Sequence, residues 1–222
     1  MAAFNDCPLV SRSAQRSPTA SIRLRIVFRV NDFGVSFPCV SSSHVQGAET
    51  GAPADIVETT FWHYNDQVCR GEMDMETFNR KLTQELKADK PLNWTEYYME
   101  AIEPIPAMHE LVKWAAEHYR VGLLTNIMPG FVDIMLERGL LPNAGYEAII
   151  DSSQVKAIKP EPEIYGAATE KAHCSPSEIL LVDDSRVNLM AAEKHGWHVL
   201  WFDDYRPDES VERIKNSLQS DS

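Results

Sequence analysis

The chain has 222 residues, of which 44% are hydrophobic, and it carries a formal net charge of −12 at pH 7. That apolar content suits one large domain, or a core domain with a small insert, and excludes a chain that is disordered throughout. The net negative charge argues against a surface that binds nucleic acid or anionic membrane, because such a surface would need clustered Lys and Arg. No apolar run approaches the ~20 residues of a membrane span.

The N-terminal segment differs in composition from the rest of the chain. Its first 25 residues are rich in Ser and hold four Arg but only one acid. We therefore expect residues 1–21 to form a disordered leader, which weakly resembles an organellar transit peptide. The cysteines show no CxxC pair and no zinc-ligand spacing, which favours a reducing, cytoplasmic location; they are Cys7, Cys39, Cys69 and Cys174.

Two segments precede the main body of the chain. Residues 22–30, "IRLRIVFRV", concentrate β-branched residues and predict a strand, so residues 22–40 are expected to hold the first core strand and a loop. Residues 41–100 begin with a Ser-, Gly- and Pro-rich linker and continue with apolar residues spaced three and four apart, which predicts a helical unit. Asp74 is a plausible N-cap for the second helix of that unit.

Helices and strands alternate over residues 101–222. This βα repetition predicts an α/β core with a doubly wound parallel sheet. The predicted helices are 105–119, 130–140, 162–173 and 186–196, and the predicted strands are 120–126, 146–153, 178–184 and 198–204.

Polar residues lie at the ends of three of these segments, where they would meet at one edge of the sheet. Thr125 and Asn126 follow a strand, Lys159 precedes a helix, and Asp183 and Asp184 end a strand. Each has an ordinary structural explanation, as a helix cap or a solvated charge. Because ligands of open α/β sheets bind outside the carboxyl ends of the strands, their shared position also predicts a binding site.

The order of these motifs resembles the haloacid dehalogenase-like superfamily. The resemblance covers residues 102–204 and is carried by "LLTN", "KPEPEIY" and "LLVDDSRVNLMAAEKHGW", while "FWHYNDQVCRGEMDMETFNRKL" looks like that family's small cap. It implies a Rossmann-like core with a small helical cap insert. Within the superfamily the likeness is to small phosphatases that act on sugar phosphates and to the phosphatase domain joined to epoxide hydrolases.

The resemblance also implies a chemistry for the polar residues. An Asp nucleophile would attack phosphorus to form an aspartyl-phosphate, with Mg²⁺ separating the like charges of acids and substrate. Asp183 and Asp184 would hold Mg²⁺, and Lys159 would neutralise the phosphoryl oxygens. The Thr125 hydroxyl and the Asn126 amide or backbone would orient the phosphate.

The first motif can be placed in two ways. If "NDFGVSF" stands for the family's first motif, Asp32 is the nucleophile and a magnesium ligand, and Gly34 occupies the position of the usual second Asp. If "IVF" ends the strand in the usual way, Arg29 takes the nucleophile position with Asn31 as its companion, and the enzyme is inactive.

The favoured interpretation is a Mg²⁺-dependent phosphatase for a small organic phosphate, with Asp32, Thr125 and Lys159 as catalytic residues. A 2-haloacid dehalogenase-type hydrolase is the second enzymatic interpretation. The non-enzymatic alternative is a catalytically silent binding protein with the same fold. The expected partner is a small phosphorylated molecule rather than nucleic acid or membrane, and the sequence does not indicate an oligomeric state.

Overall fold

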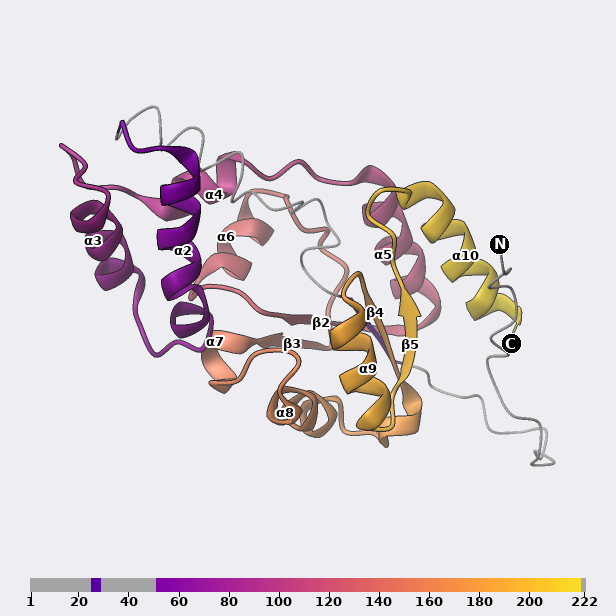
Figure 1. Cartoon of the computed structure of the whole chain (residues 1–222). Coiled ribbons are helices and arrows are strands. Elements are labelled where there is room, and N and C mark those ends of the chain that lie inside the picture. The colour runs from indigo at the N-terminus through magenta and orange to yellow at the C-terminus, as the bar shows by residue number, and fades with distance from the viewer. Residues whose placement is uncertain (1–24, 29–50, 221–222) are drawn as a thin grey trace, which may run out of the picture.

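Five parallel strands form the central sheet, in a computed structural model that describes residues 25–28 and 51–220 (Figure 1). Their order is β3-β2-β1-β4-β5, and every neighbouring pair is parallel. The strands are β1 (Arg25–Phe28), β2 (Arg120–Thr125), β3 (Ala148–Asp151), β4 (Ile179–Asp183) and β5 (His198–Trp201). Their aliphatic runs suit a parallel sheet, because both of its faces are covered.

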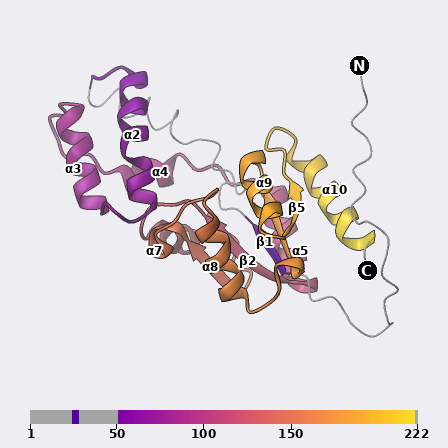
Figure 2. The ribbon, with the colours of Figure 1, turned by 60° about the horizontal axis from the view of Figure 1, so that its bottom comes forward.

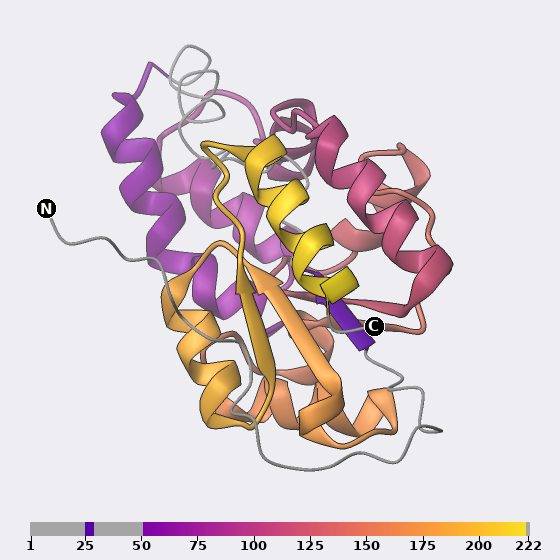
Figure 3. The ribbon, with the colours of Figure 1, turned by 90° about the vertical axis from the view of Figure 1, so that its right-hand side faces the viewer.

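Helices cover the two faces of the sheet. Ile26 and Phe28 of β1 point to the face that carries α5 (Pro106–His118), α6 (Phe131–Glu137) and α10 (Pro207–Ser220). Val27 points to the face that carries α8 (Pro162–Ala172) and α9 (Arg186–Lys194). Figure 3 shows α5 beside α10 on one side and α9 on the other. The core also contains α7 (Ser152–Val155) and a 3-10 turn over Pro176–Glu178.

Three further helices, which we call the cap, lie beyond one end of the sheet (Figures 1 and 2). They are α2 (Ala54–Cys69), α3 (Met75–Glu85) and α4 (Trp94–Glu100), and they come between β1 and α5 in the sequence. Phe61 of α2 stacks on Trp94 with ring centroids 4.4 Å apart, and the edge of Phe78 of α3 meets both rings. This buried aromatic cluster joins the three cap helices.

The predicted doubly wound parallel sheet with a small helical cap is confirmed. The Asp74 side chain accepts a hydrogen bond from the Thr77 N–H at 2.7 Å, so the predicted N-cap is also present. The helices α7 and α10 are not predicted by the sequence patterns, and Ser152, which is predicted to lie in a strand, begins α7. In the described part of the chain, no helix is long and apolar enough to cross a membrane.

The register of the sheet brings several strand ends together. Phe28, the last residue of β1, lies opposite Leu123 of β2 and Val182 of β4. Thr125 lies opposite Asp151 at the end of β3. The carboxyl ends of these strands therefore form one edge, which is the expected position of a ligand site in such a sheet.

Candidate active site

A fully buried ion pair lies at this edge. The Nζ atom of Lys159 is 2.7 Å from Oδ2 of Asp183, and neither side chain is exposed to solvent. Lys159 Nζ also donates to the Leu124 carbonyl of β2 at 2.9 Å. Since β1 lies between β2 and β4, an ammonium group that contacts both flanking strands lies at the carboxyl end of β1.

The Asp183 carboxylate is held by further donors. Its Oδ1 accepts from the Ser185 N–H at 2.8 Å, and the Asn188 side-chain amide lies 3.1 and 3.3 Å from the two oxygens. Tyr165 donates its hydroxyl hydrogen to the Asn188 carbonyl at 2.9 Å. Burial, and then the charge of Asp183, raise the pKa of Tyr165 well above its ordinary value, so its hydroxyl stays protonated and can keep donating.

The Asn126 side chain binds the backbone of Lys159 in both directions. Its Nδ2 donates to the Lys159 carbonyl at 2.9 Å, and its Oδ1 accepts from the Lys159 N–H at 2.6 Å. The loop after β2 is thereby attached to the loop that carries Lys159. Both polar atoms of the Asn126 side chain are thus engaged by the Lys159 backbone.

Thr125 presents a polar atom without a partner. The residue is fully buried, and its Oγ1 has no hydrogen-bond partner among the described residues. A buried hydroxyl that lacks a hydrogen bond is costly, which suits a position that a ligand oxygen or a water satisfies. The substrate-orienting role of Thr125 stays a prediction.

Asp184 is positioned through its backbone by a tryptophan. Trp201, at the end of β5, donates its Nε1–H to the Asp184 carbonyl at 3.0 Å. The guanidinium groups of Arg186 and Arg213 lie 5.3 and 5.7 Å from the centre of the Trp201 ring, within the range of cation–π contacts. No local sequence pattern joins Trp201 to Asp184, so this contact was not predictable from the sequence.

Ser152 is a second residue that sequence reasoning missed. Its buried hydroxyl donates to the Cys69 carbonyl at 2.6 Å and accepts from the Ile127 N–H at 2.9 Å. It thus connects the end of cap helix α2 to the loop that follows Thr125 and Asn126. No local signal in the sequence indicates these contacts, because Ser152 is predicted to lie within the strand 146–153.

The described residues hold part of the predicted metal site. Asp183 and Asp184 are adjacent at the sheet edge, but no three His, Cys, Asp or Glu side chains come together as a metal site within residues 25–28 and 51–220. Asp32, the third predicted ligand and nucleophile, lies outside the described residues, as does Arg29.

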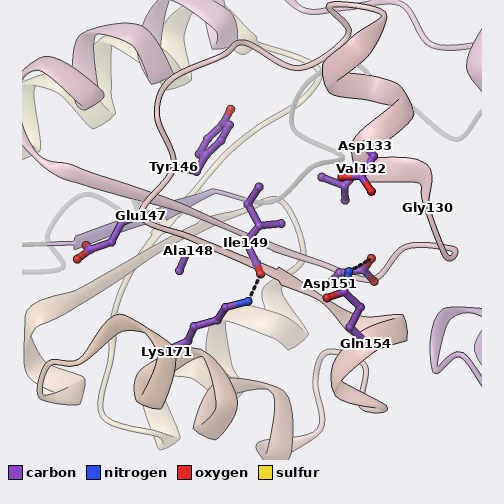
Figure 4. Close-up of a pocket in the computed structure, with 10 residues that line it drawn as sticks. All are labelled: Gly130, Val132, Asp133, Tyr146, Glu147, Ala148, Ile149, Asp151, Gln154 and Lys171. Carbon is purple, nitrogen blue, oxygen red and sulfur yellow. Dashed lines mark hydrogen bonds between the residues drawn. The ribbon is translucent and has the colours of Figure 1, made fainter.

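A cavity of about 320 Å³ opens beside β3 (Figure 4), and its lining includes neither Lys159 nor Asp183. Lys171, which is part of the lining, donates to the Ile149 carbonyl at 2.9 Å. Asp151 is the strand-end acid in its lining, and none of the predicted site residues that the structure describes contributes to it. The cavity is lined by Gly130, Val132, Asp133, Tyr146, Glu147, Ala148, Ile149, Asp151, Gln154 and Lys171.

The chain is similar in structure to several solved hydrolases. A structure described as a predicted HAD-like family hydrolase from Porphyromonas gingivalis matches with a TM-score of 0.73 and 20% identity, over 89% of this chain and 98% of that one. A HAD family enzyme from Bacteroides thetaiotaomicron, in complex with magnesium and inorganic phosphate, matches with a TM-score of 0.67 and 18% identity, over 82% and 94% of the two chains.

A dehalogenase shares the fold as well. The L-2-haloacid dehalogenase from Xanthobacter autotrophicus, with chloropropionic acid covalently bound, matches with a TM-score of 0.56 and 18% identity, over 80% of this chain and 76% of that one. The family model for haloacid dehalogenase-like hydrolases matches residues 57–202, which span the cap and all strands after β1. The chain therefore belongs to the haloacid dehalogenase-like hydrolase family.

Proposed function

We propose that this hydrolase is a Mg²⁺-dependent phosphatase that acts on a small organic phosphate. The observation that carries the proposal is the buried Lys159 ammonium, which contacts both strands that flank β1. A cation there would meet a nucleophile that follows β1 and would neutralise the oxygens of a phosphoryl group. The partnerless Thr125 hydroxyl, at the end of the adjacent strand, would donate to one of these oxygens.

We assign the nucleophile to Asp32, which follows β1 in the sequence. Its carboxylate would attack phosphorus to form an aspartyl-phosphate, which water then hydrolyses. Lys159 would hold negative charge on the nucleophile and on the phosphoryl group, while Asn126 fixes the backbone of Lys159. We retain the likeness to sugar-phosphate phosphatases, and to the phosphatase domain joined to epoxide hydrolases, as a guide to the substrates tested first.

The acids at the sheet edge fit a hard cation. Carboxylate oxygens are the ligands that Mg²⁺ prefers, and when bound the ion would offset the charge between the acids and a dianionic phosphate. Both oxygens of Asp183 already accept N–H hydrogen bonds. We therefore assign direct contact with Mg²⁺ to Asp184 and to Asp32, which is also the proposed nucleophile. Magnesium in the similar Bacteroides thetaiotaomicron structure supports this choice of metal.

The test is phosphate release from p-nitrophenyl phosphate and a panel of sugar phosphates, with Mg²⁺ and with EDTA. We expect metal-dependent turnover by the wild type and a loss of about a thousandfold or more in Asp32→Asn and Asp184→Asn. Asp204→Asn removes an exposed acid near the end of the neighbouring strand β5 and should leave turnover unchanged. Halide release from 2-chloropropionate without Mg²⁺ would instead identify a dehalogenase.

A catalytically silent binding protein is the second candidate, and the register of β1 favours it. Phe28 of β1 lies opposite Val182 of β4. Along the chain, Arg29 follows Phe28 and Asp183 follows Val182, which favours the alignment with Arg29 at the nucleophile position. The family match also begins at residue 57, after β1. Folded protein that binds Mg²⁺ or phosphate by calorimetry, but turns over none of the substrates, would establish this alternative.

Trp201→Phe is expected to weaken Mg²⁺ binding about threefold to tenfold, because the backbone of Asp184 loses one hydrogen bond while the aromatic ring remains. Isothermal titration with Mg²⁺ measures this directly. Trp197→Phe is the matched control, since the Trp197 indole donates to Thr169 on α8 at 3.0 Å. It should keep the wild-type Mg²⁺ affinity, and an equal loss in both variants would contradict the assignment.

A further inference from the structure

The end of cap helix α2 is attached to the core at three consecutive positions. The Cys69 carbonyl accepts from Ser152, and the Gly71 carbonyl accepts from Lys156 Nζ at 2.8 Å. Between them, Arg70 forms an ion pair with Glu161, in which Nε lies 3.2 Å from Oε1. We call these six residues the α2 clasp.

The clasp reaches two of the loops that carry candidate site residues, the loop after β2 and the loop before α8. Ser152, which donates to Cys69, also accepts from the N–H of Ile127, the residue after Asn126. Glu161 binds Arg70 through Oε1 and accepts from the Ile158 N–H through Oε2 at 3.0 Å. Ile158 directly precedes Lys159, so one carboxylate joins the cap to the backbone beside the buried ammonium.

The Arg70–Glu161 pair is partly exposed. About a quarter of the Arg70 side chain and a third of the Glu161 side chain are open to solvent. Because solvent screens a pair of this kind, its contribution to stability is small and a large role in folding is not expected. The guanidinium holds the pKa of Glu161 below its ordinary value, and the Ile158 N–H adds to this, so Glu161 is a carboxylate at neutral pH and can hold both partners.

We propose that Arg70 and Glu161 are positioning residues, which couple the end of cap helix α2 to the Ile158–Lys159 backbone and so help to place the Lys159 ammonium. The proposal rests on the proposed function, in which Lys159 meets the phosphoryl group. Without Arg70, the Glu161 side chain loses the partner that orients it toward Ile158. The segment before Lys159 then becomes freer to move, although its other contacts remain.

The first test does not depend on turnover. Amide hydrogen exchange is followed by mass spectrometry for the segment 157–161 in the wild type, Arg70→Met and Glu161→Gln. We expect this segment to exchange about tenfold faster in Arg70→Met, because the acceptor of the Ile158 N–H is no longer held in place. Glu161→Gln keeps an oxygen acceptor but loses the charge, and we expect an intermediate increase.

A matched control removes a different arginine that also joins cap and core. Arg138, after α6, binds both oxygens of Glu96 on α4 at 3.0 Å, and this pair lies outside the α2 clasp. Arg138→Met should leave exchange in the segment 157–161 at the wild-type rate. Unchanged exchange in Arg70→Met, or an equal increase in Arg138→Met, overturns the proposal whether or not the protein turns over a phosphate.

The second test uses a substrate that the wild type hydrolyses. Arg70→Met should lower kcat about tenfold with KM within about twofold, because a displaced ammonium affects the reacting group more than initial binding. Arg138→Met should leave both constants unchanged. A decrease in kcat/KM caused by KM alone would assign Arg70 to substrate binding and overturn the positioning role.

Discussion

Lys159→Met is expected to lower the free energy of unfolding by about 3–5 kcal/mol, since it leaves the buried Asp183 carboxylate without its cationic partner. The methionine fills most of the volume of the lysine stem, so the loss reflects charge more than a cavity. Urea denaturation followed by circular dichroism measures the change.

The double variant Lys159→Met/Asp183→Asn separates charge from packing. The asparagine side chain can still accept from the Ser185 N–H but carries no charge, so the double variant should be more stable than Lys159→Met alone. Lys113→Met is the surface control, because Lys113 pairs with Glu110 in solvent, and it should cost less than about 0.5 kcal/mol. A cost below about 1 kcal/mol for Lys159→Met would show that Asp183 does not need this cation.

Gly71→Ala is expected to destabilise the protein by about 2–4 kcal/mol. Gly71 has a φ of +60°, and a Cβ atom there would lie 2.3 Å from the Ser153 carbonyl oxygen and 2.5 Å from Lys156 Nζ. The lysine side chain could move, but the backbone oxygen of Ser153 belongs to α7, and shifting it would disturb that helix. Thermal and urea denaturation measure the loss.

Gly139→Ala controls for the backbone conformation alone. Gly139 has a φ of +70°, and a Cβ atom added there would have no other atom within 4 Å. Its replacement should cost only the left-handed backbone penalty of about 1–2 kcal/mol. Equal losses in Gly71→Ala and Gly139→Ala would mean that the contact between the end of α2 and α7 can relax.

The missed helices show which local signals are weak. In α10, Val211, Ile214 and Leu218 are buried at helical spacing, and Pro207 occupies the first turn. The helical pattern is therefore present in the sequence, but it is weak because many charged residues surround it. α7 has only four residues, which is too short for any periodicity to be read. The N-cap at Asp74 was predictable because a cap depends on residues within one turn.

The sequence by itself determined the parallel sheet and the edge at which Thr125, Lys159 and Asp183 meet. The sequence shows aliphatic runs of strand length with polar residues directly after them. In an α/β chain these local patterns lead to a parallel sheet with the polar residues at the carboxyl ends of its strands. The proposed roles of these residues rest on their chemistry, which the substitutions described above test.

Only the tertiary structure decided which groups contact one another at that edge. Asn126 binds the Lys159 backbone with its side chain, Trp201 binds the Asp184 carbonyl, and Glu161 joins Arg70 to Ile158. Arg70 and Glu161 are 91 positions apart in the chain, and Asn126 and Lys159 are 33 apart. Such hydrogen bonds depend on how separate elements pack, and no pattern of neighbouring residues encodes them.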